Sequence, residues 1–194
     1  MNTDQRIADI ASVRTGIYAK PAISGVARYL QVRDFDEFGR LDARVKPQLT
    51  LKGELERHLL AEGEILFAAK GTYNFATVYE ASMGPAVASS SFLVITIANS
   101  LRGSVRPDFL AWLINSPRSQ AFLKTKAKGS TPPSITRGGL EELPVAIPSL
   151  EAQASILAIS NLRTQEKRLV AELEELRQVL VDNQLTKFLE EQRG

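Results

Sequence analysis

The chain contains no cysteine and only one histidine, His58, among its 194 residues. A disulfide framework, a thiol nucleophile and a thiolate zinc site are therefore excluded, as are a histidine-rich metal site and a two-histidine mechanism. No apolar run approaches the roughly 20 residues of a membrane span, and the polar N-terminus has no signal-peptide pattern. These absences predict a soluble, cytoplasmic protein that has no membrane partner.

Common catalytic motifs are also missing. The sequence has neither the Gly-x-Gly-x-x-Gly pattern of dinucleotide sites nor the Gly-x-x-x-x-Gly-Lys-Ser/Thr pattern of phosphate loops. Thr131–Ser134 carries a Pro-Pro pair, but it lacks the leading Asn or Asp and the trailing aromatic that amino-methyltransferases use on a flipped base. Asp108 has no second carboxylate in a nuclease-like spacing, and His58 has no neighbouring serine–carboxylate pattern. We therefore predict no catalytic residues and no metal site.

The composition is that of a globular protein, but its charge is unevenly distributed. Apolar residues make up 44% and charged residues 24%, with a net charge of +2. Residues 65–140 carry eight basic and two acidic groups, a balance of 8 − 2 = +6, whereas residues 151–194 carry six basic and eight acidic groups, or 6 − 8 = −2. The first segment is thus the one expected to meet a polyanion. Scattered, solvated surface charges are the alternative interpretation.

Glycine and proline divide the chain into two parts. Both recur up to Pro148, and beyond it there is no proline and no glycine before Gly194. We therefore predict two domains, residues 1–148 and residues 149–194. The first has the pattern of an α+β (mixed α/β) domain, in which Pro107 and Pro117 begin two short helices. Apolar, β-branched runs predict strands at Ala27–Val32, Glu64–Ala69, Ala86–Ala88, Phe92–Ile97 and Leu143–Ile147.

The second part has the pattern of one long α-helix. Ser149 is a suitable N-cap, and about 40 residues of helix formers follow, about 60 Å at 1.5 Å per residue. A heptad seam, in which Glu166 occupies one a position, contains Ile159, Leu162, Leu169, Leu173, Leu176 and Leu180. Because a narrow apolar stripe needs a second long helix, we predict an intermolecular coiled coil between two copies of the chain. The predicted dimerisation residues are Leu162, Leu169, Leu173, Leu176 and Leu180. Packing of these leucines on their own domain is the alternative.

Two polar loops in the basic segment, Lys70–Asn74 and Lys126–Ser134, are typical of DNA contacts. Glycine allows close backbone approach, lysine neutralises phosphate, and Asn, Thr, Ser and Tyr can hydrogen-bond to bases or phosphates. The candidate DNA-binding residues are Lys70, Thr72, Tyr73, Asn74, Lys126, Lys128, Ser130 and Thr131, followed by Arg102, Arg106 and Arg33. Ordinary surface turns are the alternative.

Five short motifs, in this order along the chain, resemble one protein family. They are Arg28–Asp34 (RYLQVRD), Gly63–Thr72 (GEILFAAKGT), Pro107–Leu110 (PDFL), Gly129–Thr136 (GSTPPSIT) and Leu143–Pro148 (LPVAIP) followed by Gln153. Together they resemble one target-recognition domain and one spacer helix of the specificity (S) subunit of type I restriction–modification systems. Ala152 stands where the family usually has glutamate, and Pro132-Pro133-Ser134 stands where it has Gln-Pro-Asn.

The resemblance implies a non-catalytic subunit that reads a DNA sequence. Its expected partners are double-stranded DNA, methyltransferase (M) subunits and motor–nuclease (R) subunits. No cofactor is expected on this chain, since S-adenosylmethionine is expected on the M subunit. Whole S subunits resemble two such units in tandem and no second copy is found here, so the resemblance implies a half-sized subunit. Two copies would then read a bipartite, palindromic site. The alternative from another class is a coiled-coil interaction module whose body binds protein.

Overall fold

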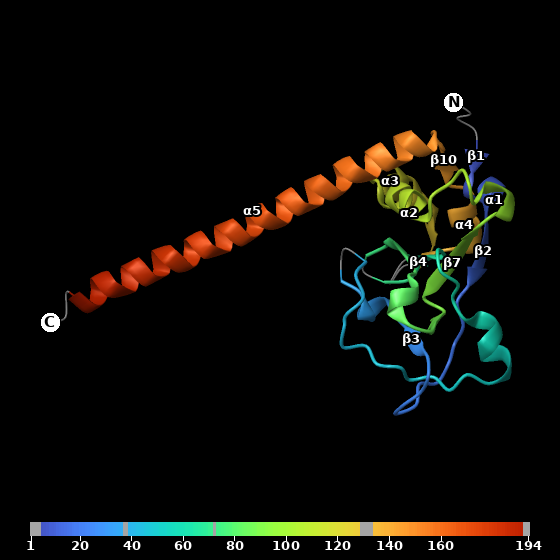
Figure 1. Cartoon of the computed structure of the whole chain (residues 1–194), viewed down its shortest axis with the longest axis horizontal. Coiled ribbons are helices and arrows are strands. Elements are labelled where there is room, and N and C mark those ends of the chain that lie inside the picture. Colours follow the sequence, from blue (N-terminus) through green and yellow to red (C-terminus); the bar gives the residue numbers. More distant parts are fainter. Residues whose placement is uncertain (1–4, 37–38, 72, 129–133, 192–194) are drawn as a thin grey trace. The chain divides into compact units, whose positions relative to one another are not determined.

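A computed structural model of the chain describes residues 5–36, 39–71, 73–128 and 134–191. The chain divides into two compact units, Met1–Gln153 and Ala154–Gly194. The first unit is built of short strands and helices, and the second is helical (Figure 1). The predicted fold class, an α+β domain followed by a long C-terminal helix, is confirmed. No helix in the described ranges is both long and apolar enough to cross a membrane.

A four-stranded antiparallel sheet forms the centre of the first unit. Its strands are ordered β2 (Ala11–Thr15), β7 (Phe92–Ile97), β4 (Ile65–Ala68) and β5 (Ala76–Val78). In the register of the central pair, Ile65 lies opposite Ile95. The sequence correctly predicted β4 and β7, the two central strands.

The central strands are continuous apolar runs because both faces of the sheet are buried. Along β4, Ile65 and Phe67 belong to one hydrophobic cluster, and Leu66 and Ala68 belong to another on the opposite face. This alternation follows the two-residue period of a strand. All four residues of β4 are therefore buried, and the strand shows no polar side that would mark a solvent-exposed face.

Four helices contribute to the first of these clusters. They are α1 (Ile7–Ile10), α2 (Pro107–Asn115), α3 (Pro117–Lys126) and α4 (Arg137–Glu141). The predicted first-turn prolines are confirmed in α2 and α3. Ser116 separates these two helices, and its hydroxyl accepts a 3.3 Å hydrogen bond from the Ser119 amide, as an N-cap does.

Three two-stranded pairings complete the first unit. β3 (Arg28–Leu30) runs parallel to β6 (Ala86–Ala88), whereas β1 with β10 and β8 with β9 are antiparallel. Their bounds are β1 Gln5–Arg6, β10 Pro144–Val145, β8 Ala127–Lys128 and β9 Ser134–Ile135. The 3₁₀ helices are η1 Val32–Asp34, η2 Gly53–His58, η3 Ala81–Met83 and η4 Asn99–Leu101.

Two predicted strands are shorter than expected. The strand predicted over Ala27–Val32 ends at Leu30, because Val32 already begins η1. The strand predicted over Leu143–Ile147 pairs only at Pro144–Val145, opposite β1. In both cases an apolar run continues beyond the residues that find a partner strand.

A buried carboxylate, that of Glu64, links three segments at one end of the central sheet. Glu64 is 7% exposed; its Oε2 accepts from Arg14 Nη2 and the Ala61 amide, both at 3.0 Å, and its Oε1 accepts from Thr96 Oγ1 at 2.8 Å. Every donor around the carboxylate comes from a different segment. Glu64 therefore ties β2, β7 and the turn before β4 together.

Replacing Glu64 by alanine is expected to destabilise the first unit. The change strands the partly buried Arg14 guanidinium, so we expect the free energy of unfolding to fall by about 2–4 kcal/mol. Urea denaturation followed by circular dichroism measures the loss. The matched control is Glu62→Ala at an exposed position of the same turn. Equal losses in the two variants would contradict the assigned role of Glu64.

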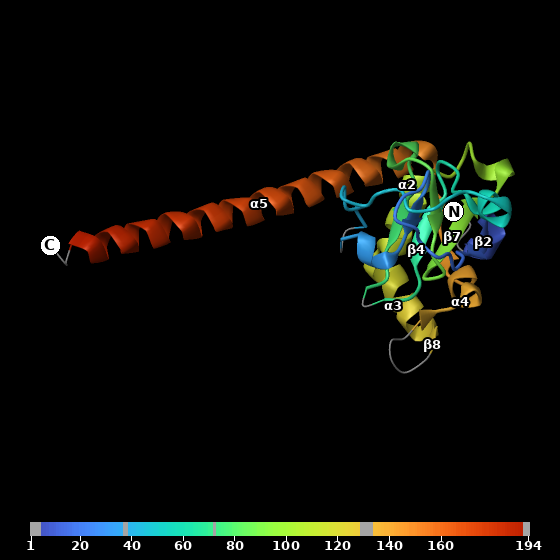
Figure 2. The same ribbon diagram turned by 90° about the horizontal axis from the view of Figure 1, so that it is seen from below.

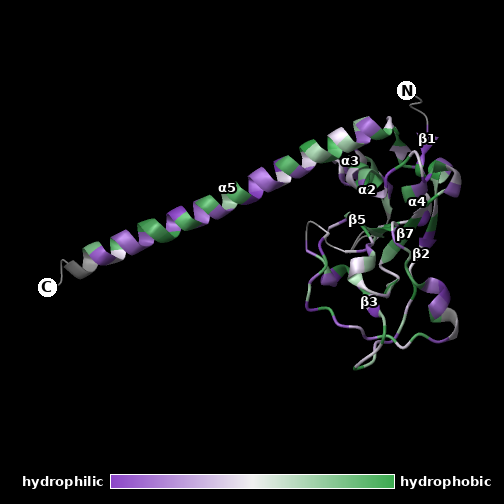
Figure 3. Ribbon diagram, in the orientation of Figure 1, coloured by the Kyte–Doolittle hydropathy of each residue, from purple (hydrophilic) through white to green (hydrophobic). Residues whose placement is uncertain are grey.

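Helix α5 spans Leu150–Glu191, 42 residues, and confirms the predicted long helix. The Ser149 hydroxyl accepts a 3.3 Å hydrogen bond from the Ala152 amide, which is the expected N-cap contact. Hydrophobic and hydrophilic residues recur along the whole length of the helix (Figure 3). The part beyond Gln153 makes up the second compact unit.

Candidate nucleic-acid interface

The first candidate loop follows β4. The Ala69 and Lys70 amides both donate to the Ser91 carbonyl, at 2.9 and 3.3 Å, so the loop begins against the start of β7. Asn74 Nδ2 donates to the Ala68 carbonyl at 2.7 Å and closes the loop from the other side. Lys70 and Tyr73 are exposed, whereas the Asn74 amide is engaged in holding the backbone. Thr72 lies outside the described residues.

The residues that flank the second candidate loop lie beside the first loop. β8 and β9 form its base, and Ser134 of β9 forms an antiparallel bridge with Lys70. The Ile135 amide donates to the Ala69 carbonyl at 3.0 Å. Two segments about 60 positions apart in sequence therefore share one edge; Figure 2 shows β8 next to α3 and α4. Two of the candidates, Ser130 and Thr131, and the side chain of Lys128 fall outside the described residues.

Lys126, at the end of α3, already has partners in the protein. Its Nζ forms an ion pair with Glu142 Oε2 at 2.5 Å and lies 5.3 Å from the centre of the Phe122 ring. The side chain is about one-third exposed. A phosphate contact by Lys126 must therefore compete with Glu142, which lowers the free energy that this lysine can contribute.

Arg33 joins the same edge through η1. A side chain at Gly71 would lie 3.2 Å from Val32 Cγ1, so the Lys70 loop passes directly over η1 and needs glycine there. The rings of Phe35 and Phe75 are 5.7 Å apart and fix the two segments on the core side. Arg33, Lys70 and Lys126 thus come from three neighbouring segments, and we name these three residues the basic row.

Arg102 and Arg106 lie elsewhere. The Lys70 amide bonds to Ser91, just before the first residue of β7, whereas η4 and Arg102 follow the last residue of that strand. A strand of six residues is about 20 Å long, so the two sites lie at opposite ends of β7. Arg106 is bound to the Asp108 carboxylate, with Nε–Oδ1 3.0 Å and Nη2–Oδ2 2.7 Å. This guanidinium lowers the pKa of Asp108, although partial burial acts in the opposite direction. The structure does not bring these two arginines together with the basic row.

Gln153 anchors the start of α5 in the first unit. It is fully buried, and its Oε1 accepts from the Arg106 amide at 2.9 Å. Its Nε2 donates to the carbonyls of Ser104 and Pro148 at 2.7 and 2.8 Å. Composition alone could not single out this glutamine among the polar residues of the helix. Its place after the Leu143–Pro148 motif is the only sequence signal that distinguished it.

The leucines of the predicted seam are exposed in the single chain. The exposed fractions are 66% for Leu162, 53% for Leu169, 47% for Leu173, 62% for Leu176 and 58% for Leu180. Helical surfaces of isolated chains seldom carry such a regular apolar stripe without a partner. The exposure leaves the whole seam available for another helix.

The fold defined by these elements is that of type I restriction–modification specificity subunits. No protein-family model and no curated protein sequence matches the chain. Among solved structures, the HsdS subunit from Thermoanaerobacter tengcongensis is similar with a TM-score of 0.58 and 13% identity, covering 83% of this chain and 37% of that one. The S subunit of the M. genitalium type I system has a TM-score of 0.58 and 15% identity, covering 90% and 42%.

A third similar chain comes from a structural study of assembly and conformational transition in the type I restriction–modification system. Its TM-score is 0.63 at 15% identity, and the match covers 92% of this chain and 44% of that chain. The chain thus spans about two-fifths of the length of the solved structures that it matches. At these identities the similarity establishes the fold.

Proposed function

We propose that this chain is a non-catalytic DNA-specificity subunit of a type I restriction–modification complex. It acts as a homodimer, reads a bipartite palindromic site and positions M subunits, with R subunits as the further partners for restriction. S-adenosylmethionine belongs to the M subunit, so this chain needs no cofactor. The observation that carries the proposal is the specificity-subunit fold, which covers 83–92% of the chain.

The basic row supplies the electrostatic part of DNA binding. Arg33 and Lys70 are exposed and lie on neighbouring segments, so both can reach the phosphates of one duplex. Phosphate contacts set the register of the protein on DNA but carry no sequence information. Sequence must therefore be read by polar side chains beside the row, and the exposed Tyr73 is one candidate.

Pairing through the exposed seam brings in a second copy of the chain, whose first unit reads the second half-site. Two helices joined through Leu169, Leu173, Leu176 and their neighbours bury apolar surface that a single chain leaves in water. Two identical readers related by a twofold axis then recognise the same half-site in opposite orientations. The paired helices act as a spacer that separates the half-sites by about one turn of DNA.

Selection from a random duplex pool tests the proposal. The purified chain is incubated with the pool, bound duplexes are recovered, and their sequences are determined. We expect one enriched sequence with two short, inverted half-sites and an unspecified spacer of about one helical turn. Recovery of no preferred sequence would contradict the proposal. Weak, salt-insensitive retention of DNA would instead favour the interaction module whose body binds protein.

A second test concerns the basic row. The double variant Lys70→Ala, Lys126→Ala is expected to bind the selected duplex more weakly, with a shallower dependence of log affinity on log salt. Each lost phosphate contact should reduce the slope by about 0.9, measured by fluorescence polarisation over a salt series. The control is Lys167→Ala, Arg168→Ala, which removes the same charge from exposed positions of α5. Equal slope changes in both variants would count against the row.

A further inference from the structure

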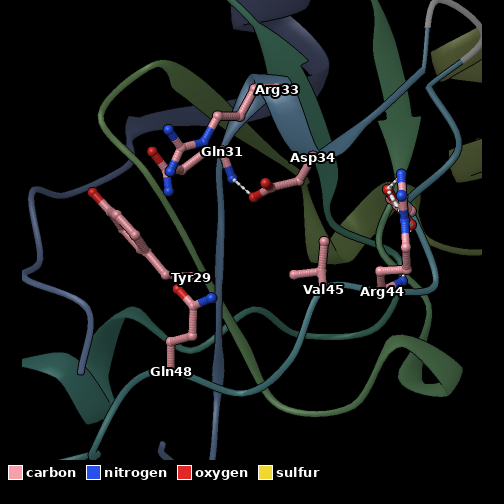
Figure 4. A pocket seen from close by; sticks show the side chains of 8 residues that line it. Tyr29, Gln31, Arg33, Asp34, Arg44, Val45 and Gln48 are labelled. Carbon is pink, nitrogen blue, oxygen red and sulfur yellow. Dashed lines mark hydrogen bonds and ion pairs between the residues drawn. The ribbon is translucent and has the colours of Figure 1, made fainter. Parts of the chain in front are cut away.

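A polar groove opens beside η1, next to the basic row. Its volume is about 390 Å³, and the residues that line it include Tyr29, Gln31, Arg33, Asp42, Arg44 and Gln48. They come from β3, from η1 and the residue before it, and from the segment that follows residue 41; Figure 4 labels all of them except Asp42. Arg33 belongs both to this groove and to the basic row, so a duplex bound along the row passes the mouth of the groove.

The walls of the groove are held by backbone contacts. The Gln48 and Leu49 amides both donate to the Ala27 carbonyl, at 2.8 and 2.9 Å. These bonds hold the segment around Gln48 against the residue that precedes β3. Tyr29 is 6% exposed, and its hydroxyl donates to the Ile17 carbonyl at 3.0 Å. The carboxamides of Gln31 and Gln48 therefore project from backbones that are fixed before any ligand binds.

The charges around the groove neutralise one another. Asp42 binds Arg44 through both carboxylate oxygens, at 2.7–3.0 Å, and these bonds lower the pKa of Asp42 to about 2. Asp34 also lines the groove and accepts a 2.8 Å hydrogen bond from the Gln31 amide, so the lining holds a second carboxylate beside the guanidinium groups of Arg33 and Arg44. A groove with two carboxylates and two guanidinium groups does not select a phosphate. It fits a neutral ligand that offers both donors and acceptors.

Three polar groups remain available for such a ligand. Within the described part of the chain, no hydrogen bond is found for the side chains of Arg33 or Gln48, and the Gln31 side chain accepts from the Asp34 amide in a capping box, which leaves its NH₂ group to donate. A glutamine carboxamide presents one acceptor and one donor side by side. This pair matches N6–H₂ and N7 on the major-groove edge of adenine.

We propose that this groove reads an A·T base pair in each half-site, with the Gln48 carboxamide bonding to N6 and N7 of adenine, the Gln31 amide group donating to O4 of the paired thymine, and Arg33 contacting the adjoining phosphate. The inference rests on the proposed DNA-reading function and deepens it. It assigns base recognition to the residue between β3 and η1 and to the segment around Gln48, neither of which belongs to the two loops singled out by sequence.

The test repeats the duplex selection with Gln31→Ala and Gln48→Ala variants of the full chain. We expect each variant to lose its preference at one base pair per half-site and to bind the wild-type site about 10-fold or more weakly. The slope of log affinity against log salt should stay unchanged, because no phosphate contact is lost. The matched control is Gln178→Ala at an exposed position of α5.

A second substitution guards against a folding defect. Gln31→Glu and Gln48→Glu keep the side-chain shape, but the new carboxylate can only accept. The preferred base that faces each substituted side chain should therefore shift towards cytosine, whose N4 donates. Unaltered selected sequences in all four variants would overturn the inference. A uniform loss of affinity with a shallower salt slope would overturn it in favour of a phosphate site. Failure of the wild-type chain to select any sequence would instead defeat the proposed function.

Discussion

Changing both Leu173 and Leu176 to aspartate is expected to convert a dimer into monomers. These side chains are 47% and 62% exposed in the single chain and occupy consecutive core positions of the heptad seam. In a dimer the change removes four buried leucines, each contributing about 1.5–3 kcal/mol, and introduces four carboxylates at the interface. Light scattering should give half of the wild-type mass.

The same variant should lose the preference for bipartite DNA while each domain keeps its affinity for a single half-site. The matched control is Val181→Asp, Leu185→Asp, which replaces two equally exposed apolar residues at b and f positions of the same helix. We expect this control to remain dimeric. A seam variant with undiminished mass, or a control that dissociates as readily, would show that the heptad seam is not the interface.

Replacing Gln153 by leucine is expected to destabilise the first unit by about 3 kcal/mol. Leucine fills a similar volume but cannot bond to the Arg106 amide or to the Ser104 and Pro148 carbonyls. Leaving such buried groups without partners costs more than the hydrogen bonds themselves contribute. Urea denaturation followed by circular dichroism measures the change in the free energy of unfolding.

The control for this experiment is Gln178→Leu, which makes the same replacement at an exposed position of α5. We expect its unfolding midpoint to match that of the wild type. If the two variants unfold at the same urea concentration, Gln153 has no anchoring role.

Local patterns sufficed for the elements whose stability comes from their own residues. The N-cap at Ser149, the long run of helix formers and the leucine spacing predicted α5 without reference to any other segment. The runs of β4 and β7 are apolar at nearly every position because they lie between two cores. Such runs identify central strands even when their partners are unknown.

The edge strands were not predictable in this way. β2, with the sequence Ala-Ser-Val-Arg-Thr, and β5, with Ala-Thr-Val, carry too few apolar residues to differ from loops. They become strands because β7 and β4 offer them free backbone groups. Tertiary context, rather than propensity, decides such segments.

The sequence alone was enough to specify the class of fold, the long helix with its seam, and the segment that carries excess positive charge. Tertiary packing decided which basic residues lie on neighbouring segments: the close approach of Gly71 to Val32 brings the segment of Arg33 next to that of Lys70, whereas β7 separates Arg102 from Lys70. It also engaged Asn74 and Lys126 in internal bonds and turned the Gln48 side chain towards the groove. The physical reason is that hydrogen-bond partners and distances between remote segments depend on how the chain folds, which spacing along the sequence does not encode.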